Sequence, residues 1–143
     1  TRRSSDLDCP PDLTFAADGT LLGQALANLV RNAVESMQEH GSDPARIRLA
    51  ACPLDVADAD QPHLCIRVED SGPGIPPEVE ARMFNPFFTT RASGTGLGLA
   101  IVHRIVDAHG GSIRIGRSDW GGAAFELVLP HPESNETYAD LAA

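Results

Sequence analysis

The sequence contains no lysine, and all eleven of its basic residues are arginine. This absence excludes several kinds of active site. A P-loop requires a lysine on the phosphates, a eukaryotic-type protein kinase requires a strand lysine, and Schiff-base chemistry requires an amine. If the chain binds a nucleotide, it must do so by another arrangement.

Other features are also scarce. An apolar run of about 18 residues, which a membrane span requires, is missing, as is a signal-peptide pattern. The three cysteines form no Cys-x-x-Cys pair, which argues against a zinc site and favours a reducing cytosol. The net charge of −9 disfavours nucleic-acid binding, and it implies that an anionic ligand needs a metal ion or local positive charge. We therefore expect a cytoplasmic domain, cut from a longer protein, with no nucleic-acid partner and no direct membrane contact.

The order of the expected elements indicates the fold class. Residues 1–11 are predicted to be an incoming linker, residues 12–130 one domain, and residues 131–143 a C-terminal tail or linker. Strands are predicted at 13–15, 46–52, 63–70, 111–118 and 122–130, helices at 19–41, 77–84 and 97–109, and a loop at 85–96. This order favours an α/β protein, a two-layer sandwich with a mixed, largely antiparallel sheet and helices on one face.

The helix expected over 19–41 has an unusual polar face. Its apolar face repeats at helical spacing through Leu22, Leu26, Leu29, Ala33 and Met37. Away from that face, Asn28, Asn32 and Glu35 follow at spacings of four and three. A solvated face is one interpretation. However, asparagine is costly inside a helix, and oxygen donors at this spacing suit a hard cation such as Mg²⁺.

Strand alternation places Asp70 on the same face as Leu64, Ile66 and Val68. A carboxylate on an apolar face is costly unless it meets a donor. Two kinds of donor could meet the carboxylate of Asp70, and both could do so at once. One is the backbone N–H of Gly72 or Gly74 in an Asx-type turn, and the other is a ligand group such as the amino group of a purine.

Glycines alternate with larger residues at Gly94, Gly96 and Gly98, just before the predicted helix over 97–109. Close approach of a phosphate to a helix N-terminus would require bare backbone there. A flexible loop and tight helix–sheet packing are the alternatives. Upstream, Phe84, Phe87 and Phe88 cluster in one loop, either as a satellite core or as the hinge of a lid over a pocket.

Together these stretches resemble the ATP-binding catalytic domain of bacterial sensor histidine kinases, in the gyrase–Hsp90–histidine kinase–MutL superfamily. "LANLVRNAVES" is similar to the N box, "DSGPGIP" to the G1 box, "FNPFFTT" to the F box and "GTGLGLAIV" to the G2 box. Four motifs in this order and spacing are specific, and they cover about residues 12–130. The resemblance implies the Bergerat ATP-binding fold with an ATP lid, and it implies ATP and Mg²⁺ as cofactors.

The resemblance also assigns residues. Asn32 matches the Mg²⁺-binding asparagine, Asn28 a phosphate-side position, and Glu35 a position near the metal. Asp70 matches the acceptor of the adenine amino group. The other residues that the resemblance places around the nucleotide are Gly72, Gly74, Ile75, Phe88, Thr89, Arg91, Gly94, Thr95, Gly96, Leu97, Gly98 and Leu99. Asn32, Glu35 and Arg91 are the expected catalytic residues.

Two departures from the family pattern qualify this assignment. Ala123 stands where many relatives have Thr or Ser, which puts a second, water-bridged adenine contact in doubt. None of the five histidines matches the phosphoacceptor pattern. The resemblance therefore implies, as partners, a histidine-containing dimerisation domain and, indirectly, a response regulator receiver domain. A degenerate docking module and a superfamily ATPase of another type are the alternative functions.

Overall fold

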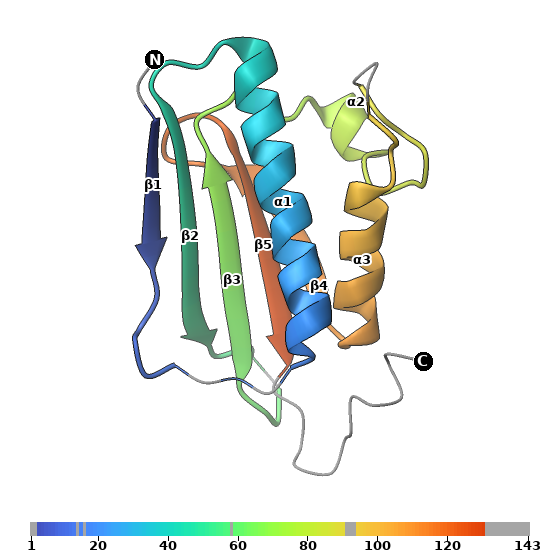
Figure 1. Ribbon diagram of the computed structural model, residues 1–143. Coiled ribbons are helices and arrows are strands. Elements are labelled where there is room, and N and C mark those ends of the chain that lie inside the picture. The colour runs from blue at the N-terminus through green and yellow to red at the C-terminus, as the bar shows by residue number, and fades with distance from the viewer. Residues whose placement is uncertain (1–2, 14, 16, 58, 91–93, 131–143) are drawn as a thin grey trace.

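The computed structural model describes residues 3–13, 15, 17–57, 59–90 and 94–130. Its sheet has five strands in the order β1-β2-β3-β5-β4 (Figure 1). The strands are β1 (Arg3–Asp8), β2 (Ala45–Leu54), β3 (His63–Asp70), β4 (Ser112–Arg117) and β5 (Ala123–Pro130). β1 pairs with β2 in parallel, and the other neighbours pair antiparallel. The predicted mixed, largely antiparallel sheet is confirmed.

Helices lie on one face of this sheet, as predicted (Figure 1). They are α1 (Gly19–His40), α2 (Pro77–Glu80) and α3 (Gly98–Ala108). α1 begins where the side chain of Asp18 accepts a hydrogen bond from the N–H of Leu21 at 3.0 Å. It ends at Gly41, whose φ of 69° is left-handed.

The core lies between the helices and the inner face of the sheet. The largest fully buried side chains come from both layers: Leu29, Val68, Val102, Val106, Phe125, Leu127 and Leu129. On β3, Leu64, Ile66 and Val68 alternate into this core, and Asp70 ends the row with 3% of its surface exposed. The strand therefore carries a buried carboxylate to the edge of the core, as the alternation predicted.

The first strand differs from the prediction. Residues 3–8, expected to be linker, form β1, whereas Leu13 and Phe15 of the predicted strand 13–15 belong to no strand. β1 is an edge strand with little to bury, since Leu7 is 79% exposed. It is held by backbone pairing with β2, to which Arg48 and Asp6 add an ion pair at 4.0 Å. A strand that is held mainly by backbone pairing need not show alternating apolar residues in its sequence, which is why β1 was not predicted.

One smaller difference concerns the end of an element. The predicted helix 77–84 is helical only over α2 and continues as turns. Arg91 and the tail from 131 to 143 lie outside the described residues. Among the residues described, no helix is long and apolar enough to span a membrane.

Candidate functional site

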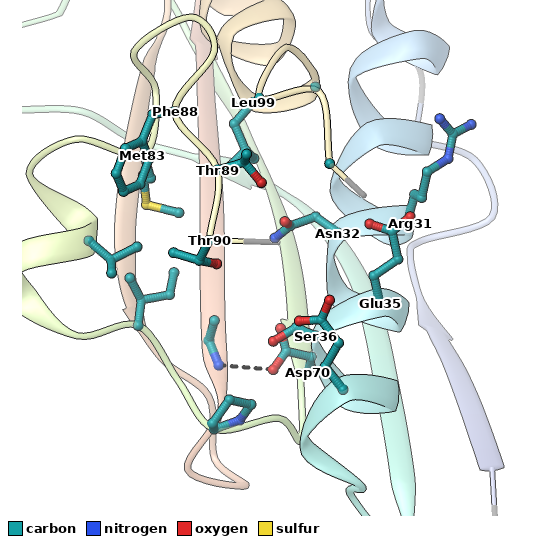
Figure 2. Close-up of a pocket in the computed structure, with 18 of the residues that line it drawn as sticks. Arg31, Asn32, Glu35, Ser36, Asp70, Met83, Phe88, Thr89, Thr90 and Leu99 are labelled. Atoms are coloured by element: carbon teal, nitrogen blue, oxygen red, sulfur yellow. Dashed lines mark hydrogen bonds between the residues drawn. The ribbon is translucent and has the colours of Figure 1, made fainter. Parts of the chain in front are cut away.

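A cavity of about 650 Å³ opens between α1, the end of β3, α2 and the segment that leads into α3 (Figure 2). Most of the predicted site residues line it: Asn28, Asn32, Glu35, Asp70, Gly74, Ile75, Phe88, Thr89, Gly94, Thr95, Gly96, Gly98 and Leu99. Gly72 and Leu97 are not among the lining residues, and Arg91 lies outside the described part of the chain. The volume of the cavity is within the range of small-molecule binding sites.

The polar face of α1 turns toward this cavity rather than toward open solvent. Asn28, Asn32 and Glu35 are each half-buried and line the wall. Ser36 also lines it, and sequence analysis missed this residue although it continues the spacing of four from Asn32. Arg31 lies on the same helix at the wall and brings a positive charge that the sequence analysis did not assign. These side chains therefore line a cavity rather than a fully exposed helix face, and their role in binding stays a prediction.

Asp70 is fixed by the backbone around it. Its Oδ1 accepts hydrogen bonds from the N–H of Gly72 at 2.9 Å and the N–H of Ala123 at 3.1 Å. The first bond is the predicted Asx-type turn, and the second ties the end of β3 to the start of β5. Both bonds end on the same oxygen. Within the described residues Oδ2 has no such bond, so one carboxylate oxygen remains available at the cavity wall (Figure 2).

Burial of Asp70 raises the pKa of its carboxyl above the usual value of 3.8, because desolvation disfavours the charged form. The two backbone N–H groups, from Ala123 and then Gly72, oppose this by stabilising the carboxylate. Desolvation has the larger effect. A buried acid with a raised pKa, beside a cavity, is typical of a functional position.

Ser118, in the hairpin between β4 and β5, forms hydrogen bonds that hold the backbone of Asp70 in place. Its Oγ donates to the main-chain carbonyl oxygen of Asp70 at 2.6 Å and accepts from the N–H of Gly122 at 3.0 Å. The residue is buried, with 6% of its surface exposed. Nothing in the sequence distinguishes it from an ordinary polar turn residue, and sequence analysis missed it.

Gly122 is required by the same junction. A methyl group on its Cα would overlap both the carbonyl oxygen and Oδ1 of Asp70. Gly74, which lies next to the backbone of Gly121 and Gly122, has a φ of 80°, which also favours glycine. The bare backbone at Gly122 thus lets β5 approach the carboxylate closely enough for the Ala123 bond.

An apolar wall faces Asp70 across the cavity. Ile75 and Leu99 were predicted there, and Val79 and Met83 join them. Ala123 lines the cavity beside Asp70, to which its N–H is bonded. Met83 is 5% exposed, and Val79 packs against the core. Their spacing of four in the segment predicted as helix 77–84 was a usable signal for one apolar face. A flat apolar group with one polar edge toward Asp70 would fit this wall.

The glycine-rich segment has a packing reason of its own. The carbonyl oxygen of Gly96 accepts a hydrogen bond from the N–H of Phe87 at 2.9 Å, and a side chain at Gly96 would overlap the Phe87 backbone. This is loop-to-loop packing rather than the helix–sheet packing considered above. At Gly98, where α3 begins, no side chain of a described residue caps the helix. The N-terminal amides of α3 therefore meet the cavity without a side-chain acceptor.

The phenylalanine cluster divides in two. Phe84 packs edge-on against Phe125 of the core, with ring centroids 6.4 Å apart, and Phe88 lines the cavity with Arg82 over its ring. Phe87 is 75% exposed with a φ of 67°. The satellite-core interpretation therefore holds for Phe84 and Phe88 and fails for Phe87.

Comparison with known proteins places this architecture. Residues 17–133 match the family described as "Histidine kinase-, DNA gyrase B-, and HSP90-like ATPase". The chain belongs to this family. The four stretches that resemble the N, G1, F and G2 boxes all lie within the matched residues.

Curated relatives within the family are sensor histidine kinases. The chain is 43% identical over 122 residues to the signal transduction histidine-protein kinase AtoS of Escherichia coli, a match that covers 85% of this chain and 19% of AtoS. It is 40% identical over 119 residues to the C4-dicarboxylate transport sensor protein DctS of Rhodobacter capsulatus, covering 82% of this chain and 17% of DctS. The chain therefore spans about a fifth of the length of these relatives.

Solved structures agree with the fold. The catalytic domain of histidine kinase ThkA, in a nucleotide-free form, aligns with a TM-score of 0.73 and 34% identity over 90% of this chain and 80% of that one. A mycobacterial sensor histidine kinase, MprB, aligns with a TM-score of 0.72 and 31% identity over 90% and 81% of the two chains. The predicted α/β fold of the histidine kinase ATPase domain is confirmed.

Proposed function

We propose that this domain binds Mg²⁺-ATP in the cavity and donates the γ-phosphate to a histidine on a separate dimerisation domain of a sensor histidine kinase. The observation that carries the proposal is the buried Asp70. Its carboxylate stands at the end of an apolar strand, with Oδ1 held by two backbone N–H groups. A purine amino group is a donor of the right chemistry for the remaining oxygen, and the apolar wall suits the ring.

The other end of the cavity suits phosphates. Glycines line it at Gly94, Gly96 and Gly98, and α3 begins there with uncapped amides among the described residues. Helix N-termini attract anions because their N–H groups and dipole carry partial positive charge. With a net charge of −9 on the chain, this local positive end would hold the triphosphate against a repulsive background.

The residues present also fit a magnesium ion carried by phosphates. In the part of the chain that the structure describes, no group of three or more His, Cys, Asp or Glu side chains could hold a metal alone. Mg²⁺ keeps several waters and binds through few protein oxygens together with substrate phosphates. Asn32 would supply an amide oxygen, with Glu35 beside it on the same face of α1. When bound, the ion would offset phosphate charge.

The chain's contribution to phosphotransfer is then mainly positioning. Asp70 and the apolar wall would hold the base, while the α3 amides orient the phosphates toward an incoming histidine. A response regulator receiver domain would take the phosphate next, from that histidine. A degenerate docking module is the alternative, and it predicts an intact fold without nucleotide binding.

Calorimetric titration of the domain with ATP, with and without Mg²⁺, tests the proposal. We expect saturable binding that Asp70→Asn weakens about ten- to a hundredfold, the equivalent of roughly 1.5–3 kcal/mol for a lost charge-assisted bond. Asp55→Asn, at an exposed loop position, makes the same chemical change away from the cavity and should leave binding unchanged. No binding at millimolar ATP, or an unaltered affinity in folded Asp70→Asn, would reject the adenine assignment.

A further inference from the structure

Two of the three cysteines of the chain lie near one end of the sheet. β2 ends there and β3 begins there, at the lower end in Figure 1, whereas β1 ends higher, where Asp8 pairs with Ala50. Cys9 follows β1, Cys52 lies near the end of β2, and Cys65 lies near the start of β3. Asp70 stands at the other end of β3, so this region is separate from the cavity already described.

Cys52 and Cys65 are direct cross-strand partners in the antiparallel pairing of β2 with β3. Both strand positions belong to the face opposite the helices, since the neighbouring Leu64 and Ile66 point into the core. Both cysteines are free thiols, Cys52 exposed and Cys65 partly exposed. Two thiols thus stand side by side on an accessible sheet surface.

The distance between Cys52 and Cys65 follows from the hydrogen-bonding pattern between β2 and β3. The N–H of Ser71 bonds to the carbonyl oxygen of Arg46 at 3.0 Å, and hydrogen-bonded pairs alternate with non-bonded pairs from there. The alternation makes Cys52–Cys65 a hydrogen-bonded pair and leaves Pro53, which has no N–H, in a non-bonded one. Bonded pairs are the wider kind, with Cα atoms about 5.5 Å apart and Cβ atoms about 5 Å apart.

A direct disulfide would need Cβ atoms about 3.8 Å apart, so the two Cβ atoms would have to come about 1 Å closer, although a Cα separation of about 5.5 Å is within the disulfide range. A single atom bridging the two sulfurs avoids this requirement. Burial also raises the pKa of the Cys65 thiol, with Glu126 and Cys52 adding to the effect, so this thiol is protonated at neutral pH. A ligand for the pair must therefore exchange with thiol protons and bind two sulfurs at once.

We infer that Cys52 and Cys65 form a dithiol site for a trivalent arsenical that carries one organic group. A zinc ion is less suitable because zinc sites use four ligands, and no cluster of three or more ligating side chains occurs among the residues described. A monosubstituted arsenical has two positions left for sulfur. For an arsenic oxide R–As=O, two S–As bonds form, both thiol protons leave with the oxide oxygen as water, and arsenic stays trivalent.

Phenylarsine oxide added to the folded domain tests this inference in a Cys9→Ser background, which removes the third thiol. We expect intact mass to show one phenylarsenic per chain and a thiol assay to lose both remaining thiols. Because two sulfurs hold the arsenic, the adduct should survive an excess of a monothiol and be released by a dithiol. Nucleotide affinity serves as a separate readout and should not change, since the pair lies at the other end of β3.

Two matched variants locate the site. Cys52→Ser and Cys65→Ser, each in the Cys9→Ser background, leave a single thiol, and their adducts should be released by the monothiol. Cys65→Ser in the otherwise native chain keeps only Cys9 and Cys52. Its adduct should also be released by the monothiol. The inference would be overturned if the monothiol wash restored both thiols of the Cys9→Ser chain. It would also be overturned if either chain carrying Cys65→Ser kept its arsenic through that wash as well as the Cys9→Ser chain does.

Discussion

The hydroxyl of Ser118 donates a 2.6 Å hydrogen bond to the main-chain carbonyl oxygen of Asp70, across the junction between the β4–β5 hairpin and the end of β3. The hydroxyl oxygen of Ser118 in turn accepts a hydrogen bond from the N–H of Gly122 at 3.0 Å. One buried side chain thus satisfies polar groups on both sides of the carboxylate that the proposed function requires. Its removal should affect the fold and the site together.

Ser118→Ala is expected to lower the free energy of unfolding by roughly 1–3 kcal/mol, because it leaves a buried carbonyl and a buried N–H without their partner. ATP affinity should fall as well, since Asp70 loses its support. Urea unfolding and calorimetry measure the two effects. Ser112→Ala, at an exposed position on β4, is the control and should change neither. A Ser118→Ala domain of unchanged stability would show that the bond contributes nothing net.

Gly122→Ala should be more damaging to binding. The added methyl group would overlap the carbonyl oxygen and Oδ1 of Asp70, so β5 or the carboxylate must move. Overpacking of this kind costs about 1–3 kcal/mol, and the displaced Asp70 should lose most of its ATP affinity. Gly116→Ala is the matched control, because nothing lies within 4 Å of a Cβ placed there. Thermal unfolding and ATP titration of both variants separate the clash from the loss of a glycine.

The raised pKa of Asp70 predicts a pH effect on stability. The folded state holds the proton at pH values where the unfolded state, with a pKa near 3.8, has released it. Asp70 therefore favours folding fully below the unfolded pKa, and this contribution is lost as pH rises through the folded pKa. Asp70→Asn keeps an oxygen for the two backbone N–H groups and carries no charge to bury.

We accordingly expect Asp70→Asn, without nucleotide, to gain stability relative to the native domain as pH rises through that window. Urea unfolding over a pH series measures the difference between the two proteins, and taking the difference removes the effect of carboxylates common to both. A difference that stays constant with pH, or that falls as pH rises, contradicts the burial argument.

Parts of this fold could be predicted because their sequence pattern reflects burial directly. The repeat from Leu22 to Met37 predicted α1, and the alternation from Leu64 to Val68 predicted β3 and the buried position of Asp70. β1 could not be predicted in this way. Its Leu7 is exposed, and its strand conformation depends on pairing with residues about forty positions later, from Ala45 onward.

The site shows the same division. Asn28, Asn32 and Asp70 could be found because each is a costly residue type for its local position. Ser118 is an unremarkable hairpin residue until the hairpin folds over the end of β3 and buries it. Gly96 was singled out because a phosphate would need bare backbone there, whereas in the structure it is the Phe87 backbone that leaves no room for a side chain. This contact joins two loop positions, and no periodic pattern in the sequence relates them.

Asn32 provides the last prediction, which concerns the metal. Asn32→Ala should abolish the Mg²⁺ dependence of ATP affinity and stop phosphotransfer to a supplied histidine domain, because the variant removes the amide oxygen proposed to hold the ion. Alanine is the better helix former, by about 0.7 kcal/mol or less, so α1 itself should not weaken. Gln24→Ala, at an exposed position of the same helix, is the control and should retain both properties. Titrations with and without Mg²⁺ and a phosphotransfer assay measure the effects. If Asn32→Ala still phosphorylates the supplied domain at the native rate, the metal is held by other residues and the role proposed for this face of α1 is wrong.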